Sequence, residues 1–179
     1  GIALQISYSE TISLRNLITL SKNNNKLPVL ICLDGITDPH NVGAIIRSAE
    51  AFGCEGVIIP QRRSAGLTGT VAKVAAGAIE HIPVCRVVNL NRALQELKDE
   101  GFVVLGLKEN SNMNIINFKE RSPLVVVVGS ENKGLSLLTQ KNCDYLLKIN
   151  LKGKTNSLNA SVAAAICMHQ LTKESFHVK

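Results

Sequence analysis

The chain contains six short segments that are apolar and rich in β-branched residues, and more polar stretches separate them. Several, such as LVVVVG at 124–129, are continuously apolar. Segments of this kind are typical of strands that are buried on both faces of a parallel sheet. We therefore expect strands at residues 27–34, 56–60, 82–88, 102–107, 124–129 and 144–149.

Helical patterns lie between the predicted strands. After the first strand, apolar residues recur with the period of an α-helix, in a helix predicted to open at Asn41 and to stop at Gly53. Another helix is predicted from a cap at Asn89 to Glu100, and one more at residues 9–21, before a polar loop at 22–26. This alternation predicts an α/β fold, a mostly parallel sheet flanked by helices.

The charge of the chain favours a polyanionic partner. Its 20 Lys and Arg against 14 Asp and Glu give a formal net charge of +6. Nucleic acid is the usual partner of such a surface. Because the chain has no Trp, two Tyr and four Phe, we expect contacts to phosphate and sugar rather than bases stacked on aromatic rings.

The cysteines and histidines give no sign of a metal site. The five cysteines never approach a CxxC spacing and the four histidines are scattered, so no metal ligand is predicted and a reducing compartment fits. No apolar run approaches the ~20 residues that span a bilayer, so no membrane partner is predicted. We expect a cytoplasmic protein, or one from an organelle of bacterial descent if a targeting segment was removed, since the chain begins at Gly1 rather than Met.

Three loops after predicted strands carry the candidate chemistry: DGITDPHNVG (34–43), GSENKG (129–134) and NLKGKTNSLNAS (150–161). Ligands collect at the carboxyl ends of strands in parallel α/β sheets. None of the loops contains G-x-G-x-x-G or G-x-x-x-x-G-K-[ST], which argues against ordinary dinucleotide and P-loop sites. The loops alone leave open an α/β enzyme or a nucleic-acid binder.

Several polar side chains of these loops are candidates for a site. Arg47 shares one side of its helix with Gly43 and two alanines, which would let another backbone or a ligand come close. Glu131 lies just past a buried strand, in a loop whose glycines a turn alone would explain. Ser157 and Asn159 precede an alanine-rich helix that they could cap.

Together the three loops resemble the motifs of the SpoU/TrmH family of RNA ribose 2′-O-methyltransferases, in the SPOUT superfamily. The motifs stand here as DPHNVGAIIRSAEAFG, VVVVGSENKGL and INLKGKTNSLNASVAAAI. The segment RRSAGLTGTVAKVAAGAIEHIPV between the first two is similar to the bacterial 23S rRNA guanosine branch. The resemblance runs from about residue 27 to the last helix.

The resemblance implies a fold with a C-terminal deep trefoil knot, and S-adenosylmethionine held largely by backbone groups of the second and third motifs. It also implies a homodimer with the active site near the subunit interface. The implied polar catalytic set is Asn41, Arg47, Glu131, Ser157 and Asn159. The implied cofactor-binding residues are Gly129, Ser130, Gly134, Ile149, Leu151, Leu158 and Ala163.

The resemblance also divides the chain. Residues 27–179 would form the catalytic domain, and residues 1–26 would follow a linker after an N-terminal RNA-binding domain that this chain lacks. Without that domain we expect cofactor binding but poor methylation of RNA.

The expected reaction is methylation of a ribose 2′-hydroxyl, at a guanosine of 23S-type rRNA. The alternatives are a tRNA enzyme of the same family, a catalytically silent RNA-binding relative, and an unrelated α/β enzyme that uses another nucleotide. A guanidinium stays protonated near neutral pH, so we expect Arg47 to clamp an RNA phosphate rather than to act as a base.

Overall fold

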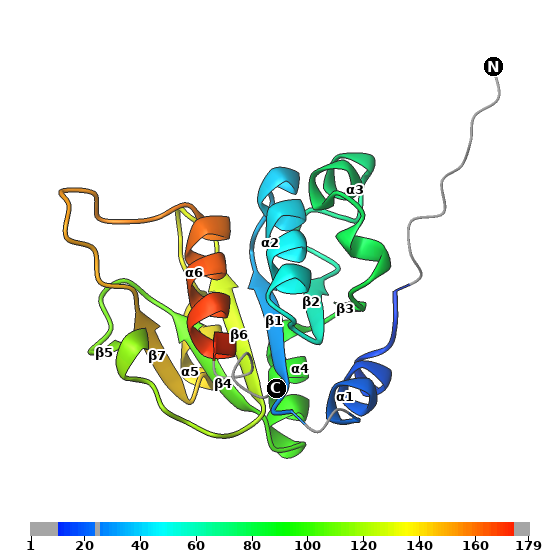
Figure 1. Ribbon diagram of the computed structural model, residues 1–179, viewed down its shortest axis with the longest axis horizontal. Coiled ribbons are helices and arrows are strands. Elements are labelled where there is room, and N and C mark those ends of the chain that lie inside the picture. Colours follow the sequence, from blue (N-terminus) through cyan, green and yellow to red (C-terminus); the bar gives the residue numbers. More distant parts are fainter. Residues whose placement is uncertain (1–10, 24–25, 174–179) are drawn as a thin grey trace.

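A parallel sheet of seven strands forms the centre of the computed structural model, which describes residues 11–23 and 26–173 (Figure 1). The strand order is β3-β2-β1-β6-β4-β7-β5, and every pair of neighbouring strands is parallel. The predicted mostly parallel sheet is therefore confirmed. The strands are β1 Val29–Asp34, β2 Gly56–Pro60, β3 Val84–Val87, β4 Val103–Leu107, β5 Met113–Asn114, β6 Leu124–Gly129 and β7 Tyr145–Lys148.

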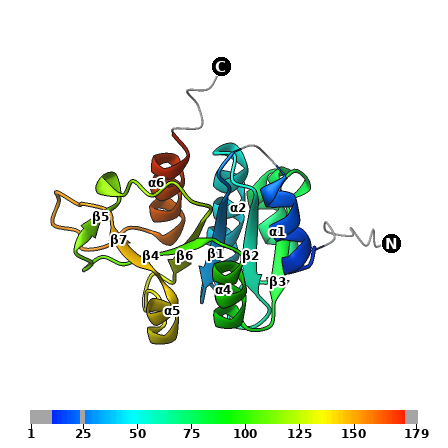
Figure 2. The same cartoon turned by 90° about the horizontal axis from the view of Figure 1, so that it is seen from below.

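Helices cover both faces of the sheet. Figure 2 shows α2 and α6 on one face and α4 and α5 on the other. Core packing places α3 on the side of α2, and α1 on the side of α4. The helices are α1 Leu14–Lys22, α2 Pro39–Ala51, α3 Gly69–Ala75, α4 Leu90–Asp99, α5 Leu137–Asn142 and α6 Ala160–Thr172, with short 3-10 helices η1 Ala78–Glu80 and η2 Ile115–Asn117.

Strand β1 shows why the apolar segments are continuous. Along it, Ile31 and Leu33 pack under α2 and α6, whereas Leu30 and Cys32 face the side of α1 and α4. Successive strand residues point to opposite faces, so a strand between two helical layers needs an apolar side chain at nearly every position. This confirms the expectation of strands buried on both faces.

Two predicted helix starts need correction. Helix α2 begins at Pro39, two residues before the predicted Asn41, because the carboxylate of Asp38 caps it by accepting from the His40 N–H at 2.9 Å. Helix α1 begins at Leu14 after a Ser13 cap; of its predicted start, residues 9 and 10 lie outside the described residues. The two-residue strand β5 was not predicted, since it is too short to show a period.

The sheet brings the loops after β1 and β6 side by side. Asp34 at the end of β1 is in register with Gly129 at the end of β6. The Ser136 N–H donates to a carboxylate oxygen of Asp34 at 2.8 Å, which ties the loop after β6 to the end of β1. The two loops are thus fixed at one edge of the sheet.

The third loop returns the chain from the side of the sheet to its middle. After β7, residues 149–159 run back along the same edge, and α6 packs beside α2 and over β1 and β6 (Figure 1). This loop and the loop after β6 line the same cavity. The trefoil knot itself stays a prediction of the family resemblance.

Within the described ranges, no helix is long and apolar enough to cross a membrane.

Candidate functional site

A cavity of about 300 Å³ lies at the carboxyl edge of the sheet, between the ends of β4, β6 and β7 and the start of α6. Its volume is at the lower end of the range for small-molecule sites. The wall combines backbone of the loop after β6 with apolar side chains from β6, β7 and α6. All seven residues expected to bind the cofactor line it: Gly129, Ser130, Gly134, Ile149, Leu151, Leu158 and Ala163.

A tight turn of residues 130–134 forms one wall of this cavity. The Gly134 N–H donates to the Ser130 carbonyl at 2.8 Å, and Gly134 has a φ of +62°, which suits glycine. A Cβ on Gly129 would lie 2.3 Å from the Gly134 carbonyl carbon. Both glycines are therefore required by the turn, and they bring bare backbone to the cavity.

A hydrogen-bonded network beside the cavity joins all three predicted loops. One carboxylate oxygen of Glu131 accepts from the Asn41 side-chain amide at 3.1 Å and from the Ala160 N–H at 3.1 Å. The same oxygen accepts a short hydrogen bond from the Asn159 side-chain amide, which also donates to the Asn41 side-chain oxygen at 3.0 Å. Asn41 is buried, whereas Glu131 and Asn159 are exposed.

Asn159 has two tasks in this network. Its side-chain oxygen caps α6 by accepting from the Ser161 N–H at 2.9 Å and the Val162 N–H at 3.3 Å. Its amide group donates to Glu131 and Asn41. The Glu131 carboxylate thus lies at the N-terminus of α6, where the helix dipole favours a negative charge. Capping, one of the roles considered for Asn159, is confirmed.

The other two predicted catalytic residues lie apart from the network. Ser157 is exposed and makes no hydrogen bond to any described residue. Arg47 is exposed on the side of α2 that faces α3, where it lines a shallow groove with His40 and Lys73. Of the five polar residues of the expected set, the fold of one chain therefore brings three together.

The side of α2 that carries Gly43 packs against α3 of the same chain. A Cβ on Gly43 would lie 2.7 Å from the Val74 Cβ and 2.8 Å from the Val71 carbonyl oxygen, both of α3. The sequence left open whether another backbone or a ligand comes close to this side of α2. At Gly43 the close neighbour is the backbone of α3.

Cysteine chemistry is disfavoured in the described part of the chain. Burial raises the pKa of Cys54 and of Cys143 to about 12 and that of Cys85 to about 11. These thiols stay protonated near neutral pH and pack as small apolar groups, whereas a nucleophile must be a thiolate. No group of three or more His, Cys, Asp or Glu residues capable of holding a metal occurs among the described residues.

Some residues that line the cavity or the groove beside Arg47 were not singled out from the sequence. Lys108, Glu109 and Gln140 line the cavity, and the Lys108 ammonium donates to the Gln140 side-chain oxygen at 2.8 Å. Residues 108 and 109 directly follow a predicted strand, and this position could have indicated that they lie at the site. His40 and Lys73 had no such signal, because the contact between α2 and α3 brings them together.

Comparison with known proteins gives consistent results. Residues 28–169 match the family model described as SpoU rRNA Methylase family. A Synechocystis protein named an uncharacterized tRNA/rRNA methyltransferase is 54% identical over 97% of this chain. A putative TrmH family tRNA/rRNA methyltransferase of Bacillus subtilis is 43% identical over 97% of the chain. This chain spans 45% of the Synechocystis protein and 70% of the Bacillus protein.

Solved structures share the fold. The SpoU methyltransferase AviRb of Streptomyces viridochromogenes, in complex with AdoMet, superposes with a TM-score of 0.83 at 23% identity, over 94% of this chain and 67% of that one. An AdoMet-bound rRNA methyltransferase of Sinorhizobium meliloti gives a TM-score of 0.83 at 22% identity, over 93% and 62%.

The Glu131 network predicts a measurable contribution to stability. Glu131→Ala should lower the free energy of unfolding by about 1–2 kcal/mol, because three N–H donors lose their shared acceptor. Glu131→Gln should lose less, since it keeps an acceptor oxygen. Urea unfolding followed by circular dichroism measures both. The matched control is Glu109→Ala, on the wall of the same cavity with no hydrogen bond to a described residue. Equal stability of the two alanine variants would contradict this role.

Proposed function

Since this chain belongs to the SpoU rRNA methylase family, we propose that it forms the catalytic domain of an enzyme that methylates a ribose 2′-hydroxyl of RNA, with S-adenosylmethionine as methyl donor. The observation that carries the proposal is the meeting of the cavity with the Asn41–Glu131–Asn159 network at one edge of the sheet. Residues 27–179 are the proposed domain, and the sheet begins inside it at Val29. Of the segment 1–26 expected to precede it, α1 is helical and packs on the same sheet, on the side of α4.

The cavity suits a compact cofactor that is held mainly by backbone. Gly129 and Gly134 keep side chains out of one wall, so peptide N–H and C=O groups are available to a polar ligand. Ile149, Leu151 and Leu158 add apolar surface for a flat ring. When bound, S-adenosylmethionine supplies a methyl group on a positively charged sulfur, which becomes neutral as the methyl leaves.

The protein's own contribution is to position the ribose and to stabilise charge on its oxygen. A hydroxyl is a weak nucleophile until its proton leaves or the developing negative charge is stabilised. The Glu131 oxygen already accepts three hydrogen bonds, which suits orientation of Asn41 and Asn159 better than proton abstraction, so the hydroxyl proton is proposed to pass to solvent water. Arg47, a permanent cation outside the network, is proposed to clamp a phosphate next to the target ribose. Ser157 is proposed to contact the same substrate from the loop before α6.

The RNA substrate is proposed to be rRNA, at a guanosine of the 23S type. The segment 62–84 supports this choice through its similarity to that branch of the family. Both curated relatives described above carry names that include tRNA as well as rRNA, so a tRNA substrate is the alternative. A cytoplasmic location is proposed with either substrate, in keeping with bacterial relatives.

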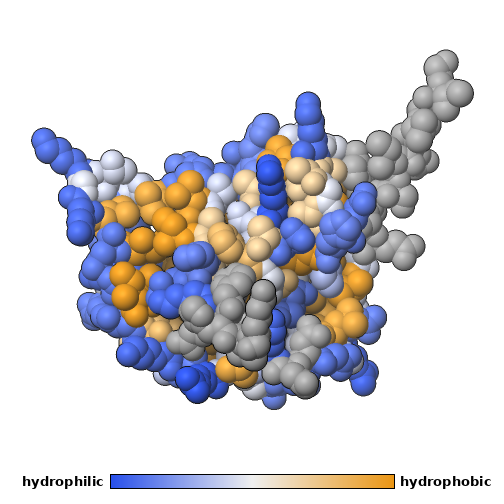
Figure 3. Space-filling model, in the orientation of Figure 1, coloured by the Kyte–Doolittle hydropathy of each residue, from blue (hydrophilic) through white to orange (hydrophobic). Residues whose placement is uncertain are grey.

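We also propose a homodimer that covers the outer side of α6. Ala164 and Met168, on the inner side, are buried in the chain's own core. On the outer side, Val162 is 46% and Ile166 40% exposed, and Figure 3 shows apolar surface on the face that α2 and α6 form. Exposed apolar side chains gathered on one face favour a protein partner.

Sedimentation tests the dimer. The chain should sediment as a dimer at micromolar concentration, and Ile166→Glu should shift it toward monomer, since burying an unpaired carboxylate in an interface is unfavourable. Leu138→Glu is the control, because Leu138 is also exposed but lies in α5, on the opposite face of the sheet. A wild-type monomer at this concentration would contradict the dimer.

Cofactor binding is tested at Gly129. Gly129→Ala places a Cβ against the Gly134 backbone, so the turn must move, and affinity for S-adenosylmethionine should fall by about tenfold or more. Gly66→Ala is the matched control, because a Cβ there meets nothing within 4 Å. Isothermal calorimetry measures affinity, and circular dichroism checks that both variants fold. Unchanged affinity of folded Gly129→Ala would place the cofactor elsewhere.

Methyl transfer and the role of Arg47 are tested together. The chain is incubated with labelled S-adenosylmethionine and either unmodified 23S-type rRNA or unmodified tRNA, and the labelled nucleotide is mapped. Arg47→Lys should lose most of the activity at every pH, by about tenfold or more, because lysine lacks the two-pronged planar grip. Its cofactor affinity should stay near that of the wild type.

Arg92→Lys, on α4 at the opposite face of the sheet, should keep its activity. Recovery of Arg47→Lys as pH approaches the range in which lysine loses its proton would support proton abstraction instead. Absence of label in both RNAs, even at high enzyme concentration, would argue for a catalytically silent relative.

A further inference from the structure

A shallow groove between α2 and α3 gathers positive charge. Arg47 of α2 and Lys73 of α3 line it and carry this charge, and His40 lines it at the start of α2. Thr70 adds a hydroxyl, and no acidic side chain lines the groove. In the described ranges, Arg47 and Lys73 take part in neither of the two ion pairs, which join Lys22 to Glu100 and Lys98 to Asp144.

The distance between the two helices is fixed by packing. Gly43 lets α3 approach so closely that a Cβ there would lie 2.8 Å from the Val71 carbonyl oxygen. Behind the groove, Val71 and Ala75 of α3 are fully buried in the core. The cationic side chains therefore stand on a rigid base, although they repel one another and gain nothing from a described acidic neighbour.

Two residues with a left-handed backbone lie before and after α3. Among the described residues, the two non-glycine residues with positive φ are Arg63 at 58° and Ala76 at 51°, and they lie on either side of α3. Left-handed conformations cost free energy at such residues, and they persist where the surrounding structure imposes them, often at binding sites. Ala76 is the C-cap of α3, where its N–H donates to the Lys73 carbonyl, so its left-handed conformation fixes the end of the helix that carries Lys73.

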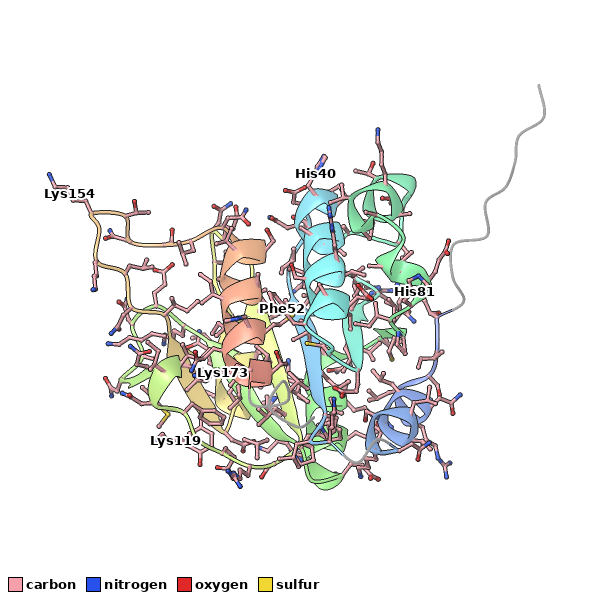
Figure 4. All side chains as sticks on the ribbon, in the orientation of Figure 1. His40, Phe52, His81, Lys119, Lys154 and Lys173 are labelled. Carbon is pink, nitrogen blue, oxygen red and sulfur yellow. The ribbon has the colours of Figure 1, made fainter. Side chains whose placement is uncertain are left out.

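The groove opens at the same edge of the sheet as the cofactor cavity. Figure 4 shows His40 at the start of α2 and Lys154 on the loop after β7, both at this edge. Helix α2 lies between the two sites, with Asn41 in the network and Arg47 in the groove. A strand that crosses α2 would therefore contact both.

We propose that the groove between α2 and α3 binds consecutive phosphates of single-stranded RNA beside the target nucleotide, with Lys73 as a phosphate-binding residue in addition to Arg47. This inference rests on the proposed RNA methylation. Two cations, Arg47 and Lys73, in a groove with no Phe, Tyr or Trp suit a phosphate backbone better than bases. The contact positions the strand over the cavity and carries no base specificity.

The test measures binding of a fluorescent single-stranded RNA oligonucleotide by anisotropy, in the presence of S-adenosylmethionine, between about 50 and 200 mM salt. Lys73→Gln should weaken binding by about three- to tenfold and reduce the salt slope by about 0.7, the contribution of one phosphate contact on a single strand. Lys73 is exposed, so the substitution leaves the fold intact. Its cofactor affinity, measured by calorimetry, should not change.

Lys141→Gln is the matched control, an exposed lysine of α5 on the opposite face of the sheet. If Lys73→Gln binds RNA with the affinity and salt slope of Lys141→Gln while the wild type binds RNA, the inference is overturned and the proposed function stands. If the wild type binds S-adenosylmethionine but no RNA, both the inference and the proposed RNA substrate are overturned.

Discussion

One carboxylate oxygen of Glu131 accepts hydrogen bonds from three N–H groups. These three bonds hold the carboxyl edge of this fold together. The donors come from α2, from the residue before α6 and from the first residue of α6, and the first two of them, Asn41 and Asn159, are 118 positions apart in the chain. These bonds tie the start of α6 to α2 and to the loop after β6, beside the cavity. The location of the carboxylate at a helix N-terminus adds the favourable field of the helix dipole.

Around this contact the site is built from backbone more than from charged side chains. Strands β1 and β6 end in register, and the Asp34 carboxylate holds the Ser136 N–H, so the turn at 130–134 has little freedom. Gly129 and Gly134 then expose peptide groups to the cavity. A wall of this kind selects a ligand by shape and by fixed hydrogen-bonding groups, which costs little reorganisation on binding.

Sequence patterns predicted those parts of the structure that local rules control. The runs at 56–60 and 124–129 match β2 and β6 residue for residue, since turns bound both buried strands. The start of α2 was missed because the Asp38–Pro39 cap precedes the apolar period. Only the family motifs predicted that Asn41, Glu131 and Asn159 would meet. The sequence predicted a close neighbour at Gly43 but did not identify it as α3. Both contacts depend on packing between distant segments.

Helix α2 links the network beside the cavity to the groove between α2 and α3. It is one unbroken helix of 13 residues, with Asn41 held by the Glu131 network on one side and Gly43 pressed against α3 on another. A packed helix moves as a unit, so a ligand that displaces Glu131 in the cavity wall would also shift Arg47 in the groove through Asn41. Such coupling is reciprocal by thermodynamic linkage, and it would appear as equal changes in the affinity of each ligand when the other is bound.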